Sequence, residues 1–293
     1  MRKTLGLVIL LLAWLASLTA CTPALPDPPA LSPTLLPSQT FSPVPSATIQ
    51  PASSTPNPPT PTITPLPPTA TATPVVEVCS PLQGVALDVL PQIVTNPFDQ
   101  PRPGEDDGHH GVDLAFYRLG DIVGIKGLPI LSVLPGTVAA AIKDRPVYGN
   151  MIIIETPLEF VPSAWDTTLQ LPAPIPTVTP PNLTCPKQAA FTNLDINRRS
   201  LYLLYAHMNQ PPTLKQGQAV ACGSPLGAVG TTGNSVNPHL HLEVRVGPAG
   251  ARFNSMAHYI GDATTEEMLN YCTWRVSGLF QMIDPMKLLT LKP

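Results

Sequence analysis

The chain has 293 residues, a formal net charge of −3 and 43% hydrophobic residues, and a chain of this length accommodates one or two domains. The 19 acidic residues outnumber the 16 lysines and arginines, so no basic surface is expected. Nucleic acids and other polyanions are therefore excluded as expected partners. Nothing in the sequence sets the oligomeric state.

The N-terminal 21 residues have the pattern of a secretory signal. Arg2 and Lys3 precede an almost entirely apolar run from Leu5 to Leu18. That run is shorter than the roughly 20 residues of a spanning helix, and no basic cluster follows it. The run ends in Leu-Thr-Ala-Cys at Cys21, which resembles the bacterial lipobox. This resemblance implies cleavage before Cys21, lipidation of Cys21 and an extracytoplasmic protein attached to the membrane by its lipid.

Residues 22–77 are predicted to form a disordered linker. They contain 17 prolines among many serines and threonines. Proline fixes φ and removes a backbone donor, and this stretch has no apolar set to bury. An extended tether or a glycosylated stalk would have the same composition.

Four cysteines remain if Cys21 carries a lipid: Cys79, Cys185, Cys222 and Cys272. An even number in an exported chain predicts two disulfides, with three possible connectivities. The favoured pairing is Cys79–Cys272, which would tie the ends of the folded domain, with Cys185–Cys222, which would hold a proline-rich insert to a strand.

Residues 78–293 are expected to form one folded, mostly β domain. Apolar runs at 130–134, 137–142, 151–154 and 201–208 alternate with turn signals such as Pro135-Gly136. This pattern favours an antiparallel sheet. Residues 157–186 contain eight prolines and are predicted to be part of an inserted loop at about 157–198. A second elaboration follows at 251–280, with a short helix expected at 266–271.

Residues 239–246 alternate strictly between polar and apolar side chains, which is typical of a strand. One face is expected to carry His239, His241, Glu243 and Arg245. The other face is expected to carry Leu240, Leu242, Val244 and Val246.

A divalent metal site is predicted from His109, Asp113 and His241. His109 and Asp113 flank Gly111, which would let the backbone turn so that both side chains face one point. Imidazole nitrogen and carboxylate oxygen are zinc ligands, and a catalytic zinc site uses three protein ligands and leaves a fourth position for water.

The remaining histidines are assigned other roles. His207 ends an apolar run and His239 lies two residues from a ligand, so both are candidates for moving a proton beside the metal. His110 is expected only to flank the site, and His258 is expected to be structural or exposed.

These segments together resemble the LytM/lysostaphin-type zinc endopeptidase family. The resemblance rests on motifs that occur in the family's order: His109-His110-Gly111-Val112-Asp113, Tyr205-Ala206-His207-Met208, Gly230-Thr231-Thr232-Gly233-Asn234-Ser235 and Pro238-His239-Leu240-His241-Leu242-Glu243-Val244-Arg245. Smaller matches are Pro135-Gly136-Thr137-Val138, Tyr148-Gly149-Asn150 and Asp284-Pro285.

The resemblance implies an antiparallel β-sheet with a groove, a Zn²⁺ held by His109, Asp113 and His241, and catalytic roles for His207 and His239. It implies hydrolysis of peptide bonds in peptidoglycan stem peptides or cross-bridges. The long insert is unusual for the family. Two alternatives stay open: a non-catalytic wall-binding or hydrolase-activating module, and a zinc peptidase that acts on a protein.

Overall fold

The computed structural model describes residues 76–116, 124–171, 184–186 and 197–291. The expected signal peptide, Cys21 and residues 22–75 of the expected linker lie outside these ranges, so those assignments stay predictions. Among the described residues, none of the helices has the length and apolar character needed to cross a bilayer.

Eight strands of the described residues form one sheet in which every pairing is antiparallel. Its order is β1 (Val94–Asn96), β2 (Val112–Leu114), β9 (Leu240–Pro248), β6 (Arg199–Ala206), β5 (Gly149–Pro157), β4 (Gly136–Arg145) and β7 (Ala219–Val220), and β10 (Gln281–Ile283) pairs with β9. A separate antiparallel pair consists of β3 (Pro129–Leu131) and β8 (Pro225–Ala228). The predicted fold class is confirmed.

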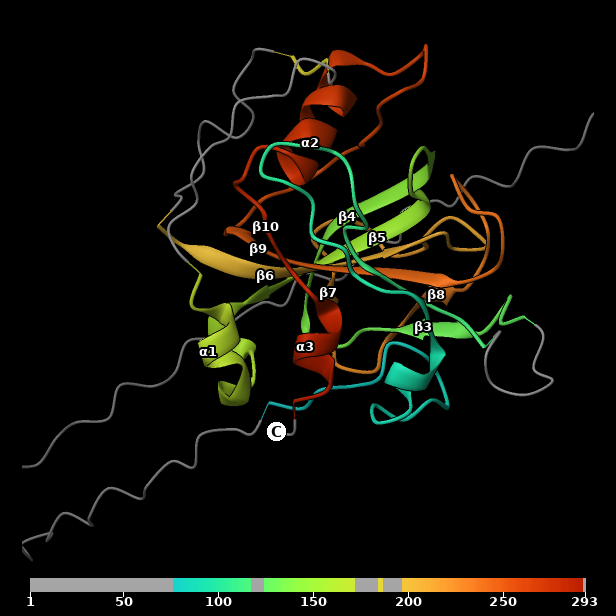
Figure 1. Cartoon of the computed structure of the whole chain (residues 1–293), viewed down its shortest axis with the longest axis vertical. Coiled ribbons are helices and arrows are strands. Elements are labelled where there is room, and N and C mark those ends of the chain that lie inside the picture. Colours follow the sequence, from blue (N-terminus) through green and yellow to red (C-terminus); the bar gives the residue numbers. More distant parts are fainter. Residues whose placement is uncertain (1–75, 117–123, 172–183, 187–196, 292–293) are drawn as a thin grey trace, which may run out of the picture. The chain divides into compact units, whose positions relative to one another are not determined.

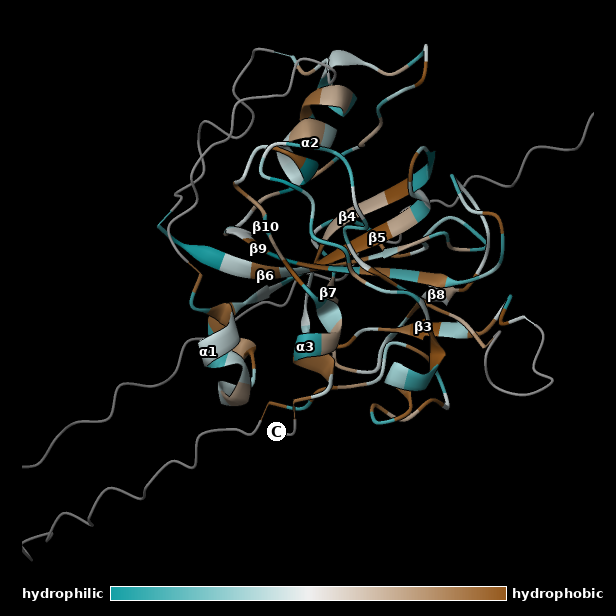
Figure 2. Ribbon diagram, viewed as in Figure 1, coloured by the Kyte–Doolittle hydropathy of each residue, from teal (hydrophilic) through white to brown (hydrophobic). Residues whose placement is uncertain are grey.

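Short helices cover both faces of the sheet (Figure 1). Their bounds are η1 (Leu90–Ile93), η2 (Leu158–Phe160), η3 (Ser163–Trp165), α1 (Asp166–Leu169), α2 (Thr265–Arg275) and α3 (Pro285–Leu289). In Figure 1, α2 lies on one side of the sheet, and α1, α3 and the β3–β8 pair lie on the other. Figure 2 shows hydrophobic residues in the middle of the central strands.

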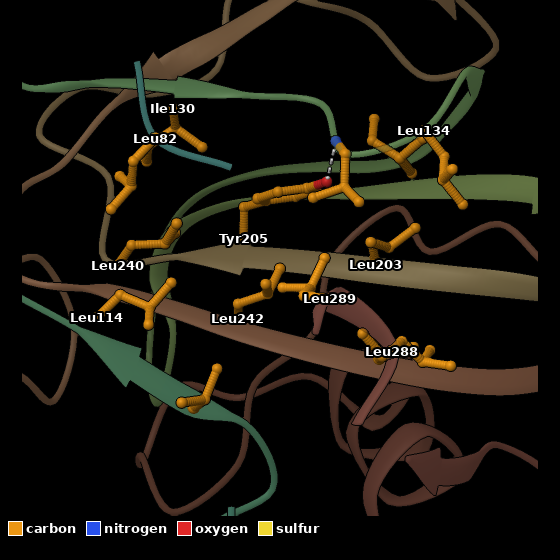
Figure 3. Packing of buried hydrophobic residues seen from close by; sticks show 14 of the residues in the cluster. Leu82, Leu114, Ile130, Leu134, Leu203, Tyr205, Leu240, Leu242, Leu288 and Leu289 are labelled. Atoms are coloured by element: carbon orange, nitrogen blue, oxygen red, sulfur yellow. Dashed lines mark hydrogen bonds between the residues drawn. The ribbon is translucent and has the colours of Figure 1, made fainter. Parts of the chain in front are cut away.

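The two faces bury two separate apolar clusters because neighbouring residues of a strand point in opposite directions. In β6, Leu203 and Tyr205 belong to the cluster on the β3–β8 side, whereas Tyr202 and Leu204 belong to the cluster under α2. Figure 3 shows the first cluster, where the buried Tyr205 hydroxyl accepts a hydrogen bond from the Val133 backbone N–H at 2.9 Å.

The predicted alternation of residues 240–246 is confirmed, but its polar face is not open to solvent. Leu240, Leu242, Val244 and Val246 belong to the first cluster. Glu243 and Arg245, on the opposite face, have exposed fractions of 0%. His239 lies just before β9 and makes an isolated bridge to Gly230.

Helix α2 is longer than the helix expected at 266–271. Thr264 begins it with a capping box, in which its side chain accepts from the Glu267 N–H while the Glu267 side chain accepts from the Thr264 N–H. The first described part of the insert, residues 157–171, contains η2, η3 and α1 and so is not a plain loop. Residues 172–183 and 187–196 of the insert lie outside the described residues.

Two disulfides are present as predicted, but the favoured pairing was wrong. The bonds are Cys79–Cys222 and Cys185–Cys272. The Cys79 N–H donates to the Val133 carbonyl, and the Gly223 N–H beside Cys222 donates to the Ser132 carbonyl. Both cysteines therefore flank the chain just after β3, whereas Cys272 on α2 lies across the sheet from them.

Candidate metal centre

The strand register brings the predicted site residues together. Asp113 in β2 is paired with His241 in β9, and His241 is paired with Ala206 at the end of β6. His207 follows Ala206, and His109 is held by a pair of backbone hydrogen bonds with Asp99. Segments far apart in the chain therefore meet at one end of β2, β9 and β6.

Gly111 lies in a bend just before β2, as expected, and it also permits a close approach of two strands. A Cβ at Gly111 would lie 2.3 Å from the carbonyl oxygen of Leu242, so a side chain would push β2 away from β9. The glycine therefore permits the close pairing that places Asp113 beside His241.

Three ligand atoms converge on one point. His109 Nε2 lies 3.1 Å from Asp113 Oδ1 and 3.2 Å from His241 Nδ1, and His241 Nδ1 lies 2.9 Å from Asp113 Oδ1. Ligands bound tetrahedrally to zinc at roughly 2.0–2.2 Å from the ion lie about 3.3 Å from one another. The separations fit a small divalent ion with these three ligands.

The opposite ring nitrogens fix the protonation needed for metal binding. His109 Nδ1 lies 2.8 Å from the carbonyl oxygen of Pro97, and His241 Nε2 lies 3.2 Å from Glu243 Oε1. Carbonyl and carboxylate oxygens only accept, so these nitrogens carry the protons. The lone pairs of His109 Nε2 and His241 Nδ1 are then free for a metal, as is usual for metal-ligating histidines.

The electrostatics of the metal-free site favour a cation. Burial alone would raise the pKa of Asp113, but the nearby rings of His109, His239 and His241 outweigh burial and hold that pKa far below its usual range. Burial would lower the pKa of His241, yet Asp113 and Glu243 raise it to about 9. Without a metal, the two carboxylates favour a proton on His241. A bound cation would balance their negative charge in its place.

His207 and His239 lie beside the three ligands. Their ring centroids are 4.7 Å apart, and the His207 ring is 5.7 Å from that of His241. His207 has a φ of 58°, a left-handed conformation that is uncommon outside glycine and clusters at functional sites. Burial is the main cause that lowers the pKa of His207, to about 3, and it is therefore neutral at pH 7.

Each of these two histidines has one nitrogen held by the backbone. His207 Nδ1 donates to the Thr232 carbonyl at 2.8 Å, and His239 Nδ1 donates to the Asn237 carbonyl at 2.8 Å. In the neutral rings both Nε2 atoms carry no proton, and that of His239 lies 3.4 Å from Asp113 Oδ1. The two nitrogens are therefore able to accept protons next to the ligand set.

The loop that holds His207 is locked in place by backbone contact. Gly149 and Gly233 both have positive φ, and a Cβ on either would lie 2.3 Å from the backbone of the opposite segment. The Thr232 hydroxyl accepts from the Asn150 N–H and donates to the Met208 carbonyl. This contact requires a glycine both at Gly149 and at Gly233, although the two lie far apart in the sequence.

The site opens into a cleft of about 550 Å³. All five predicted site residues line it, with a wall of small polar side chains. That wall includes Thr95, Asn96, Asn234, Ser235 and Asn237. Val236, at the rim, is 93% exposed.

Several polar residues behind the site were not predicted from the sequence. Glu243 accepts a hydrogen bond from the Nε2–H of His241. The alternation of residues 239–246 predicts that both side chains lie on one face of the strand. Tyr148, Trp274 and Arg275 also surround Glu243. No spacing signal marked Trp274 or Arg275, because α2 meets the site only through the tertiary fold.

His110 and His258 are both buried. His110 lies behind the site, where its Nδ1 accepts from Arg245 Nη2 at 2.8 Å, and its role as a flanking residue holds. Burial lowers its pKa to about 2. The Nε2 of His258 donates to the Thr184 carbonyl at 2.8 Å, so its role is structural and the exposed alternative is wrong.

The fold and site together define an antiparallel β-sheet domain with a His-Asp-His group that could hold a metal ion and two further histidines beside it. Residues 193–255 match the family model for Peptidase family M23. The match contains His207, His239 and His241, and it confirms the resemblance to the LytM/lysostaphin-type peptidases. It supports a metallopeptidase.

Several solved structures are similar to this chain. A zinc-containing peptidase from Vibrio cholerae is 22% identical with a TM-score of 0.30, over 52% of this chain and 32% of that one. The catalytic domain of lysostaphin from Staphylococcus simulans is 16% identical with a TM-score of 0.32, over 66% of this chain and 88% of that domain. The catalytic domain of a prophage-encoded M23 protein from Enterococcus faecalis is 20% identical with a TM-score of 0.31, over 55% of this chain and 86% of that domain. The chain thus spans about a third of the Vibrio protein's length.

Proposed function

We propose that this protein is a zinc endopeptidase that hydrolyses peptide bonds in peptidoglycan stem peptides or cross-bridges. The lipobox-like sequence at Cys21 supports attachment to a bacterial membrane outside the cytoplasm. The proline-rich segment after Cys21 supports a domain that works at a distance from that membrane.

One observation carries the proposal: His109 Nε2, Asp113 Oδ1 and His241 Nδ1 converge within 3.2 Å of one another, and both histidines have their other nitrogen turned to an acceptor. Three ligands are the number in catalytic zinc sites, which keep a further position for water or substrate. A zinc ion held here would act as a Lewis acid that polarises the scissile carbonyl and makes water more acidic.

The other two histidines supply the proton transfers. His207 and His239 line the same cleft as the three ligands. Each can accept a proton from water at Nε2 and, once protonated there, can donate that proton to a developing charge or to the leaving amine. The backbone carbonyls of Thr232 and Asn237 fix these tautomers, so the rings need not reorient before proton transfer.

The lining of the cleft supports a peptide substrate. Its walls offer short polar side chains rather than a deep apolar pocket, and the carboxamides of Asn96, Asn234 and Asn237 can hydrogen-bond to a peptide backbone. The small net charge of −3 suits a neutral or weakly charged wall peptide better than a polyanion.

The test compares the full chain with Asp113→Ala, using Asp88→Ala as a matched control because Asp88 is exposed and lies outside the cleft. Zymography on purified peptidoglycan, with and without chelator, should show clearing by the wild type and by Asp88→Ala, and none by Asp113→Ala. Elemental analysis should show one zinc per chain in the first two and none in the third. Mass spectrometry of the released fragments identifies the bond that is cut.

Three results would contradict the proposal. Zinc retained in Asp113→Ala would remove Asp113 from the ligand set. Zinc bound by a wild type that clears no wall would favour a binding or activating module. Cleavage of a protein but not of peptidoglycan would favour the alternative peptidase.

A further inference from the structure

A buried polar network lies directly behind the metal centre. At its middle is Glu243, whose side chain has an exposed fraction of 0%. Four side chains hydrogen-bond to its carboxylate: those of His241, Tyr148, Arg245 and Trp274. A carboxylate buried this deeply must be paired and hydrogen-bonded to remain charged.

The two oxygens of Glu243 have separate partners. Oε2 accepts from Trp274 Nε1 at 2.9 Å and from Arg245 Nε at 2.9 Å. Oε1 accepts from the Tyr148 hydroxyl at 2.6 Å and from His241 Nε2 at 3.2 Å. The donors on Oε2 therefore fix the plane of the carboxylate, and that plane determines where Oε1 meets the His241 ring.

Two of the residues in this network come from α2. Trp274 donates to Glu243, and Arg275 donates from Nη1 to the Tyr148 hydroxyl at 3.0 Å and from Nε to Asp106 Oδ1. The Arg275 guanidinium also lies over the Tyr148 ring, 5.8 Å from its centroid. Residues 265–275 lie beyond the segment 193–255 that matches the M23 family model.

We propose that α2 is a positioning element of the metal centre, in which Trp274 and Arg275 orient His241 through Glu243 and Tyr148. The inference rests on the proposed function only in taking the bound ion to be zinc. Neither Trp274 nor Arg275 touches the ligand atoms. Trp274 holds Glu243, which contacts His241, and Arg275 holds Tyr148, which donates to Glu243. The last turn of α2 therefore sets the direction of the His241 Nδ1 lone pair. Partners of this kind are typically worth 10–100-fold in metal affinity.

The test compares two substitutions that remove the same kind of group from the same apolar cluster. Trp274→Phe removes the donor to Glu243 and keeps an aromatic ring against Phe253 and Phe280, whose centroids lie 5.5 and 5.2 Å away. Tyr202→Phe removes a buried hydroxyl that donates to Glu155, a carboxylate with no contact to the site. Arg275→Lys is a second test variant, because a single ammonium cannot reproduce the fork that serves Tyr148 and Asp106 together.

The measurements are zinc affinity by chelator competition, the visible spectrum of the cobalt-substituted full chain, and the thermal midpoint of the metal-free chain. Trp274→Phe and Arg275→Lys should each weaken zinc binding about tenfold, at the lower end of the usual range, and should shift the cobalt bands. Tyr202→Phe should bind zinc as the wild type does and leave the cobalt spectrum unchanged, even where its thermal midpoint falls.

Other outcomes overturn the inference. Wild-type zinc affinity and an unchanged cobalt spectrum in both α2 variants would show that the network serves stability alone. Equal losses of affinity in Tyr202→Phe and Trp274→Phe would show a general loss of folding. A wild type that binds no zinc would instead overturn the proposed function, and a wild type that binds zinc without cutting peptidoglycan would leave the positioning role standing.

Discussion

Replacing Gly111 by alanine should disrupt the metal centre without altering any ligand. A Cβ at this position would lie 2.3 Å from the Leu242 carbonyl oxygen. Non-bonded carbon and oxygen atoms rarely approach closer than about 3.3 Å, so β2 and β9 would have to separate locally by about 1 Å. Asp113 is only two residues further along β2 and is paired with His241 in β9.

The magnitude follows from the narrow tolerance of metal sites. Ligand distances in a working site lie within about 0.2 Å of ideal, and a displacement of about 1 Å exceeds this several-fold. We expect zinc affinity to fall by about 10²-fold or more, which corresponds to about 2.7 kcal/mol. The free energy of unfolding of the metal-free chain should fall by about 1–3 kcal/mol, the usual cost of overpacking.

The assay is chelator competition for zinc, with thermal unfolding in excess chelator to measure the metal-free chain separately. Gly261→Ala is the matched control, because no atom lies within 4 Å of a Cβ at Gly261 and its φ is not in the left-handed range. Zinc affinity in Gly111→Ala equal to that of the control would refute the reasoning, since it would show that β2 and β9 separate without moving their ligands.

Three further predictions concern the two histidines beside the ligands, one disulfide and the first turn of α2. His207→Ala and His239→Ala should each retain zinc but lose about 10²–10⁴ in turnover, because neither is needed to fill the coordination sphere. The double substitution Cys79→Ser and Cys222→Ser opens a loop with a sequence separation of 143 and should lower the free energy of unfolding by about 2–5 kcal/mol in urea. Glu267→Gln should lower thermal stability at pH 7 by about 1 kcal/mol, because it removes the charge that pairs with Arg145 while Gln can still serve in the capping box.

The Glu267 prediction has a pH dependence with a defined sign. Burial alone would raise the pKa of Glu267, but Arg145 and Ser255 outweigh it and lower that pKa to about 2. A carboxyl group with a lowered pKa stabilises the fold above its unfolded value and loses that effect as pH falls through its folded value. The difference between wild type and Glu267→Gln should therefore shrink between pH 4.5 and pH 2.

Clear outcomes would contradict the predictions for the two histidines and for the disulfide. Loss of zinc from either histidine variant would make that residue a ligand and reverse its assignment. Peptide mapping without reductant checks the disulfides: a Cys79–Cys272 peptide, or four alkylatable thiols, would contradict the arrangement in the structure.

Local sequence was sufficient for most of the sheet. The alternation of residues 239–246 correctly placed His241 and Glu243 on one face, because side chains on a strand repeat every two residues in any tertiary context. The disulfide pairing failed because loop-closure arguments consider only positions along the chain. Cys79 and Cys272 lie on opposite faces of the sheet, and the sequence does not state on which face an irregular segment packs.

The sequence by itself provided histidine and aspartate side chains that can bind a metal ion. Its motifs were sufficient to predict His109, Asp113 and His241 as one group of ligands. Only the tertiary structure determined how these residues are held. The antiparallel register places Asp113 against His241, the absence of a side chain at Gly111 lets the two strands approach, and α2 brings Trp274 to Glu243. These relations depend on contacts between segments that are distant in the chain, and no local pattern records such contacts because they form only when the whole sheet assembles.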